Sequence, residues 1–173
     1  EANVELSKRI IKNNTLPIFH RIEWLRRHKN KDNLSNLNAE IDFTNKKISK
    51  LVTALKNSKK EIDRSYDSDD WFQWSEGRVS LGKNKSLNSS SRDFHSYGIS
   101  VGADRIKEDD RDIMYGYVFQ YGNDNVDIGY KGSKLETDAY SFALYGTKLR
   151  DDHVFTDALI GVSLLDIDQK RVT

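Results

Sequence analysis

Residues 71–82, WFQWSEGRVSLG, mark the point where the pattern of the sequence changes. Before this stretch, apolar residues recur three and four positions apart, as they do on one face of a helix. After it, apolar residues alternate with polar and small ones, and turn-forming Gly, Asn, Asp and Ser residues gather between the alternating segments. The stretch therefore predicts the first strand of a sheet that follows a helical region.

Four further segments alternate in the same way, and no helical pattern interrupts them. We therefore expect consecutive strands to pair as an antiparallel up-and-down meander. The predicted strands cover residues 71–81, 96–104, 112–121, 139–147 and 153–165. The connections between them alternate between long and short, and the predicted strands of about 9 to 13 residues match the ~9–11 residues that a tilted membrane strand needs. Both features are typical of an outer-membrane β-barrel.

The helical region before the sheet shows two kinds of pattern. Residues 1–33 hold two short helical patterns, and the second begins at Pro17, the one proline of the chain, which suits a first helical turn. Residues 34–62 carry one narrow apolar stripe and predict a long amphipathic helix of about 43 Å at ~1.5 Å per residue. Such a helix is long enough to fill a membrane barrel with a core of ~30 Å, or to form a coiled-coil stalk.

Composition and motifs argue against several functions. The 173 residues carry a formal net charge of +1, which favours neither nucleic acid nor anionic lipid, and no nucleic-acid partner is expected. The absence of cysteine excludes disulfides, thiolate metal sites and a cysteine nucleophile. His20, His28, His95 and His153 lack metal-ligand spacing, and no nucleophile, phosphate or dinucleotide motif is present. We expect no enzyme, cofactor, metal or small-molecule substrate. No run approaches the ~18 apolar residues of a membrane helix.

The two faces of the predicted strands differ in chemistry. In a soluble sheet the apolar face would form the core, whereas in a membrane barrel it faces lipid and the polar face lines a hydrated lumen. Small residues on the polar face suit a wall packed closely against a lumen-filling element. Under the barrel interpretation, the lumen-facing residues are Phe72, Trp74, Glu76, Arg78, Asp104, Gln120 and Asp157. The lipid-facing residues are then Trp71, Val79, Leu81, Tyr97, Ile99, Val101, Tyr115, Tyr117, Phe119, Tyr140, Phe142, Leu144, Ile160 and Val162.

Five segments carry a family resemblance. In order they are WFQWSEGRVSLGK, YGISVGADRIK, MYGYVFQYGNDNVDIG, SKLETDAYSFALYGT and FTDALIGVSLLDID. Together they resemble the opening strands of the autotransporter β-domain, the translocator of type V secretion in Gram-negative outer membranes. RIEWLRRH, residues 21–28, is similar to a segment upstream of such barrels.

The resemblance implies a transmembrane barrel of about 12 strands with a helix in its pore, anchoring an exported N-terminal passenger at the cell surface. Its implied partners are outer-membrane lipid, the chain's own passenger and the outer-membrane assembly machinery. Residues 1–65 would form a helical passenger-proximal segment, and residues 66–173 a partial, truncated barrel of about five strands. Some autotransporters cleave themselves inside the barrel, but no residue here is assigned that role. The alternative is a soluble adhesion module with a coiled-coil stalk and a β-sandwich head.

Overall fold

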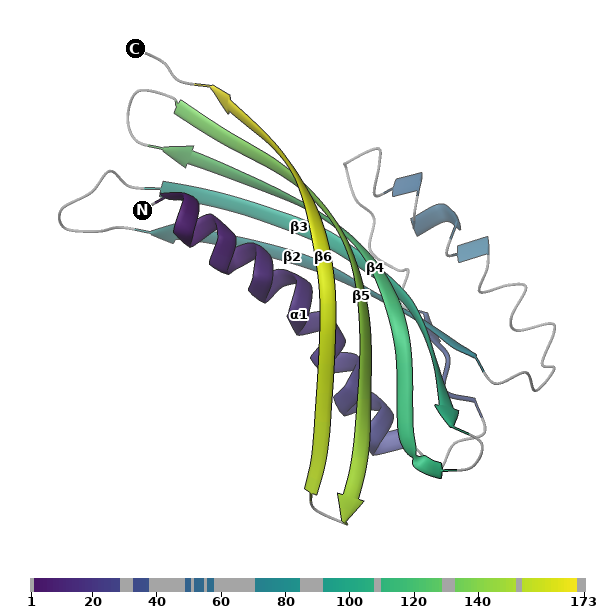
Figure 1. The fold of residues 1–173 in the computed structure, drawn as a ribbon. Coiled ribbons are helices and arrows are strands. Elements are labelled where there is room, and N and C mark those ends of the chain that lie inside the picture. The colour runs from purple at the N-terminus through teal and green to yellow at the C-terminus, as the bar shows by residue number, and fades with distance from the viewer. Residues whose placement is uncertain are drawn as a thin grey trace.

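A long helix lies against one face of a curved six-stranded sheet in the computed structural model (Figure 1). The structure describes residues 2–28, 33–37, 49–50, 52–54, 56–57, 71–84, 92–107, 110–128, 133–151 and 154–170. The elements are helix α1 (Ala2–His28) and strands β1 (Asn36–Leu37), β2 (Phe72–Asn84), β3 (Arg92–Lys107), β4 (Asp110–Ile128), β5 (Ser133–Asp151) and β6 (Val154–Lys170). Among these residues, no helix combines the length and the apolar character needed to cross a bilayer.

The strands follow one another across the sheet in the order β1-β2-β3-β4-β5-β6. From β2 onward each strand pairs antiparallel with the next, so the predicted meander is confirmed. The strands are longer than predicted, from 13 residues in β2 to 19 in β4 and β5, because pairing continues into the polar segments at their ends. In the described part of the chain the sheet is open, with β1 at one edge and β6 at the other.

The connections keep the predicted alternation of longer and shorter segments. Residues 85–91 and 129–132 join strands at one end of the sheet, and residues 108–109 and 152–153 join them at the opposite end. We refer to these as the long-connection end and the short-connection end.

Helix α1 differs from the prediction of two short helices. It runs without interruption from Ala2 to His28, and Pro17 lies inside it rather than at the start of a second helix. Pro17 and the neighbouring Ile18 are both buried. Packing of this side of the helix against the sheet therefore outweighs the local cost of proline in a helix interior.

The predicted helix over residues 34–62 is wrong at its start. Residues 36–37 are extended and form β1, which pairs parallel with β2 at Trp74 and Ser75. Residues 49–50, 52–54 and 56–57 are helical, as predicted, and the other residues of the interval from 38 onward lie outside the described part of the chain. Among the described elements it is α1, not this segment, that lies on the concave face of the sheet (Figure 1).

Candidate functional site

The interface between α1 and the concave face of the sheet holds the densest set of polar contacts in the described structure. Every residue predicted to face a lumen lies at this interface. Phe72 packs against the cluster that contains Leu25, and Trp74 packs with Ile18 and Ile22. The polar residues each contact one side chain or carbonyl of α1: Glu76 meets His20, Arg78 meets Asn13, Asp104 meets Arg21, Gln120 meets Asn14 and Asp157 meets Arg26.

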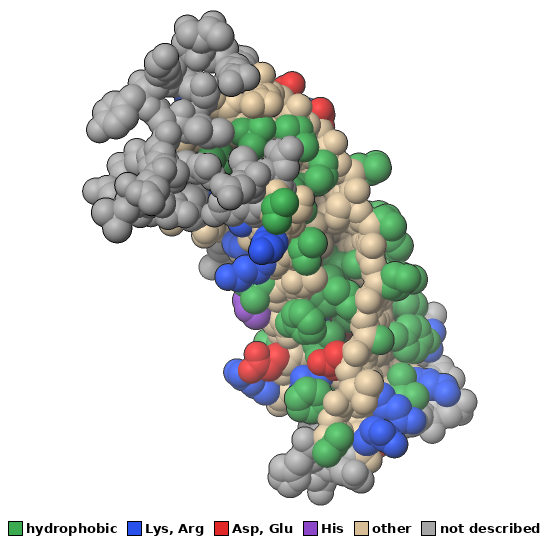
Figure 2. All heavy atoms as spheres, turned by 60° about the vertical axis from the view of Figure 1, so that its left-hand side comes forward, with side chains coloured by type: hydrophobic (Ala, Val, Ile, Leu, Met, Phe, Trp, Pro, Cys, Tyr) green, Lys and Arg blue, Asp and Glu red, His purple; other side chains and the backbone are tan. Residues whose placement is uncertain are grey.

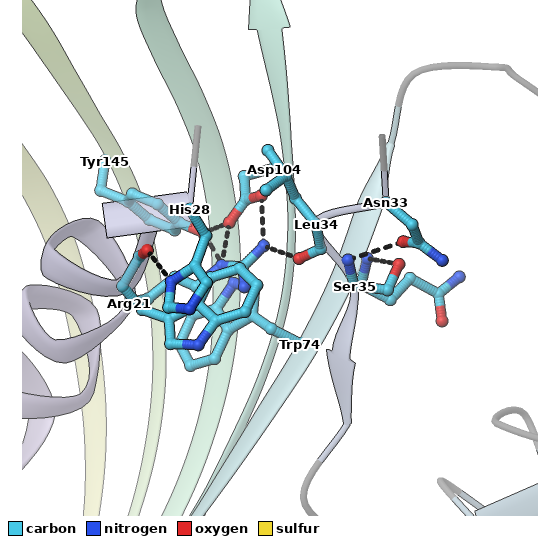
Figure 3. Close-up of polar contacts among 10 residues, drawn as sticks. Arg21, His28, Asn33, Leu34, Ser35, Trp74, Asp104 and Tyr145 are labelled. Atoms are coloured by element: carbon cyan, nitrogen blue, oxygen red, sulfur yellow. Dashed lines mark hydrogen bonds and ion pairs between the residues drawn. The ribbon is translucent and has the colours of Figure 1, made fainter. Parts of the chain in front are cut away.

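The centre of the interface is a buried ion pair between Arg21 of α1 and Asp104 of β3 (Figure 3). Arg21 donates from Nε to Asp104 Oδ2 and from Nη2 to Asp104 Oδ1, both at 2.7 Å, which is the two-pronged geometry that suits guanidinium and carboxylate. The side chains are only 2% and 1% exposed. Arg21 Nη2 also donates to the backbone carbonyl of Leu34 at 2.8 Å. This hydrogen bond connects the helix to the residues just before β1.

Two aromatic residues complete this network. Tyr145 Oη on β5 donates to Asp104 Oδ2 at 2.7 Å, and Trp74 Nε1 on β2 donates to Tyr145 Oη at 2.7 Å (Figure 3). The guanidinium of Arg21 lies 4.8 Å from the ring centroid of Trp24 and 5.9 Å from that of Trp74. Three strands thus contribute to holding one helix side chain. A buried ion pair needs several hydrogen-bond partners, because both charged groups have lost their hydration.

Charged contacts repeat toward both ends of α1 with the same sign. At the long-connection end, Arg9 donates to Asp124 at 2.7 Å and to Ser96 at 2.9 Å. At the short-connection end, Arg26 forms an ion pair with Asp157 and donates to Thr147 at 3.0 Å. The helix supplies the cations and the sheet supplies the carboxylates, so the two surfaces are electrostatically complementary along their length.

Apolar contacts fill the space between these polar pairs. Ile18 and Ile22 pack with Trp74, Val118 and Ala143. Nearer the long-connection end, Ile10 packs with Leu135 and Ala139. The glycine at position 102 leaves room for the Trp74 ring, because a Cβ there would lie 2.6 Å from Trp74 Nε1.

The convex face, on the opposite side of the same strands, exposes aliphatic and aromatic side chains. Most residues predicted to face lipid are exposed on it: Trp71, Val79, Leu81, Tyr115, Tyr117, Phe119, Tyr140, Leu144, Ile160 and Val162. Tyr97, Val101 and Phe142 are half-buried. In Figure 2, hydrophobic side chains follow much of one long edge of the molecule, and several Lys and Arg side chains lie near the lower end.

Ile99 departs from the other members of this set, because it is only 3% exposed. It lies in a cluster with Tyr121, Leu37 and Val52, and the last two come from the segment between α1 and β2. Leu37, which belongs to the apolar stripe predicted over residues 34–62, and Val52, which does not, therefore pack against the apolar face of the sheet.

Polar side chains replace apolar ones on the convex face near the long-connection end. Tyr121 Oη and Asn123 Nδ2 donate to Asp138 Oδ1 at 2.5 and 3.0 Å. Farther along, Lys134 lies 3.6 Å from Asp127. The exposed apolar surface thus forms a band that ends near Tyr121 and Tyr140.

Several interface residues were not among the sequence candidates. Those on α1 are Arg9, Asn14, Arg21 and Arg26, and those on the sheet include Ser96, Asp124 and Tyr145. On α1 the polar residues share a face with Ile10, Ile18 and Ile22, so a search for apolar periodicity alone passes over them. The alternation of the third predicted strand continues beyond residue 121 and would have reached Asp124.

No group of three or more His, Asp or Glu side chains converges on a possible metal position within the part of the chain that the structure describes. The contacts of α1 are instead those of a structural interface, in which hydrogen bonds and ion pairs hold one element in a fixed place.

A sheet with a polar concave face that holds a helix and a convex face that exposes an apolar band has the construction of a membrane β-barrel wall. In a water-soluble protein the apolar face would be the covered one. The family model of the Autotransporter beta-domain matches residues 71–173, and the chain belongs to this family. No curated protein and no solved structure matches the chain.

Proposed function

We propose that this chain is part of an outer-membrane translocator that exports and then displays a passenger preceding α1. In this proposal the convex face contacts lipid, the concave face lines a hydrated lumen, and α1 lies in that lumen. The observation that carries the proposal is the opposite covering of the two faces: α1 covers the polar one, and the apolar band of the other is exposed.

The energetics favour lipid as the solvent of the convex face. Each Å² of apolar surface left in water costs about 25 cal/mol relative to an apolar surrounding. On β6, Ile160 and Val162 are 71% and 70% exposed, and they lie on the same face as Leu144 and Phe119. Contact with acyl chains removes this cost without any protein partner.

The direction of α1 supports display at the cell surface. Arg9, near the start of the helix, contacts Ser96 and Asp124, close to the long-connection end, whereas Arg26 contacts Asp157 at the short-connection end. Outer-membrane barrels carry their longer loops outside the cell and their short turns in the periplasm. The start of α1, and any polypeptide attached to it, then points to the outside.

Lumen-lining polar groups suit both stages of the proposed export. A hydrated polar wall lets a polypeptide cross without placing its backbone groups in hydrocarbon, where each unsatisfied group is costly. When α1 reaches the lumen, the wall carboxylates Glu76, Asp104, Asp124 and Asp157 pair with its basic side chains. Docking then ends export and leaves the passenger anchored.

The proposal is tested with the full-length protein in a Gram-negative host. The protein should fractionate with the outer membrane, and its migration on a gel should change with heating as a barrel unfolds. An epitope tag placed before α1 should be accessible to antibody on intact cells. Recovery of the whole protein in the soluble fraction after lysis would contradict the proposal and favour the soluble adhesion module.

A further inference from the structure

Pro17 leaves one backbone carbonyl of α1 without its usual donor. In an α-helix the carbonyl of residue 13 accepts a hydrogen bond from the N–H of residue 17. Proline has no N–H, so Pro17 cannot donate this hydrogen bond to the backbone carbonyl of Asn13. Because Pro17 is the one proline of the chain, proline removes the intrahelical donor of a carbonyl at a single place along the helix.

The wall of the sheet supplies the missing donor. Arg78 of β2 donates from Nη1 to the carbonyl oxygen of Asn13. The next carbonyl along the helix, that of Asn14, accepts from Gln120 Nε2 of β4 at 2.9 Å. Ser141 of β5 accepts from the Asn14 side chain at 2.7 Å. Three strands therefore contact two adjacent residues of α1 at the level where the helix ladder is broken.

We infer that Arg78 is a positioning residue that recognises the carbonyl freed by Pro17 and thereby sets the position of α1 along the lumen axis. This inference rests on the proposed function, since it concerns how the helix is held after export. Moving α1 by one turn, ~5.4 Å, would place Arg78 opposite a carbonyl already paired within the helix. The Asn13 carbonyl would then be left without a donor.

The apolar contacts of α1 discriminate less between axial positions. Ile18 and Ile22 are one turn apart and chemically identical, and burial of such side chains is not directional. The contact of Arg21 with Asp104 is directional, but it does not involve the carbonyl that Pro17 leaves without a donor. The Asn13 carbonyl is the one whose intrahelical donor a proline removes. Its hydrogen bond from Arg78 therefore specifies one axial position of α1.

The test is a double-mutant cycle in the full-length protein, reconstituted in planar bilayers, where loss of α1 from the lumen opens a channel. Arg78→Met removes the donor and keeps the apolar stem, whereas Pro17→Ala restores the helical N–H. We expect Arg78→Met to raise the ratio of open to closed channels about tenfold when Pro17 is present, as for loss of a charged hydrogen bond to a buried acceptor. In the Pro17→Ala background the increase should be less than about twofold, because the carbonyl then has its own donor.

Two further variants separate positioning from general stability. Arg78→Lys keeps a donor and should restore most of the closed state. Arg26→Ala removes the contacts to Thr147 and Asp157, away from the proline, so its effect should be equal in the two backgrounds. Equal effects of Arg78→Met with and without Pro17 would overturn the inference and leave the proposed function standing. A parent protein that never reaches the outer membrane would contradict the proposed function, and this inference with it.

Discussion

The concave and convex faces of the sheet are built from alternate residues of the same strands, yet they follow opposite rules. On β4, Val118 and Gln120 lie beneath α1, whereas Phe119 between them is exposed. Between β2 and β5 the concave face carries polar side chains that contact α1, whereas the convex face exposes an apolar band outside the patch that Leu37 and Val52 cover. A protein that folds in water covers its apolar face instead, so the comparison supports the proposal that lipid and water act on opposite faces of one sheet.

The two faces also differ in how strictly the surroundings restrict the side chain at each position. Contacts on the concave face are directional, such as the hydrogen bonds of Asp104 with Arg21 and Tyr145. Under the proposed function the convex band requires only that its side chains be apolar, because acyl chains adapt to their shapes. Substitutions should therefore be sensitive to geometry on one face and to polarity on the other.

The largest effect is expected from breaking the central ion pair. Arg21→Ala leaves Asp104 charged and buried without its partner, which costs about 3–5 kcal/mol for a pair of this kind. The midpoint temperature of the heat-dependent gel shift of the full-length protein should fall accordingly. The double variant Arg21→Met with Asp104→Leu removes both charges and should recover much of the loss. No difference between the single and double variants would contradict a buried pair.

A charge in the convex band should have the next largest effect. Leu144→Arg on β5 is expected to cost about 2–4 kcal/mol if this position lies near the bilayer centre, and the cost falls to about 0–1 kcal/mol near the interface. Glu136→Arg, on the same strand and face but beyond the polar boundary, is the matched control. In water both substitutions would be nearly neutral, since Leu144 is already half exposed. Assembly into the outer membrane and thermal stability measure both.

A methyl group on the concave side should have a smaller effect that depends on position. A Cβ at Gly102 would meet Trp74 Nε1 and the Tyr117 carbonyl oxygen at 2.6 Å, so Gly102→Ala should cost about 1–3 kcal/mol through overpacking. At Gly122 the nearest atom is the carbonyl oxygen of Tyr97 at 3.9 Å, and Gly122→Ala should be nearly neutral. Equal thermal midpoints for the two variants would contradict the close packing of Trp74.

The smallest effect is expected where the convex face meets water. Lys134 and Asp127 lie opposite each other on paired strands at 3.6 Å, and both are more than half exposed. Exposed pairs of this kind contribute about 0.2–1 kcal/mol at most, and salt screens them. Lys134→Ala should leave the thermal midpoint nearly unchanged, and a large loss would move the lipid boundary closer to this end of the strands.

The strands and their faces could be predicted because alternation is a local property. Each of Trp74, Glu76 and Arg78 is assigned to the same face by counting along one strand. Strand ends were less predictable, since pairing beyond residue 121 depends on neighbours such as Asp138 rather than on apolar residues. The sheet therefore extends farther than its apolar pattern.

The identity of the helix on the concave face could not be predicted from apolar periodicity. Residues 34–62 have the more regular stripe, but the concave face is lined by carboxylates and amides that need polar partners. Helix α1 offers Arg9, Asn14 and Arg21 on the same side as its buried isoleucines, Ile10, Ile18 and Ile22. Its continuity through Pro17 was also hidden, because the compensating donor, Arg78, lies 61 positions later in the chain.

The central claim is that α1 lies against the concave face in the assembled protein. It is tested most directly by cross-linking, which the absence of native cysteine in these 173 residues makes simple to interpret. Ile10→Cys on α1 and Ala139→Cys on β5 belong to one packed cluster, whereas Tyr140→Cys lies on the opposite face of the same strand. Treating intact cells that express the full-length protein with a short thiol cross-linker should join positions 10 and 139 and leave positions 10 and 140 apart. Equal yields for the two pairs, or joining of 10 to 140 alone, would contradict the account.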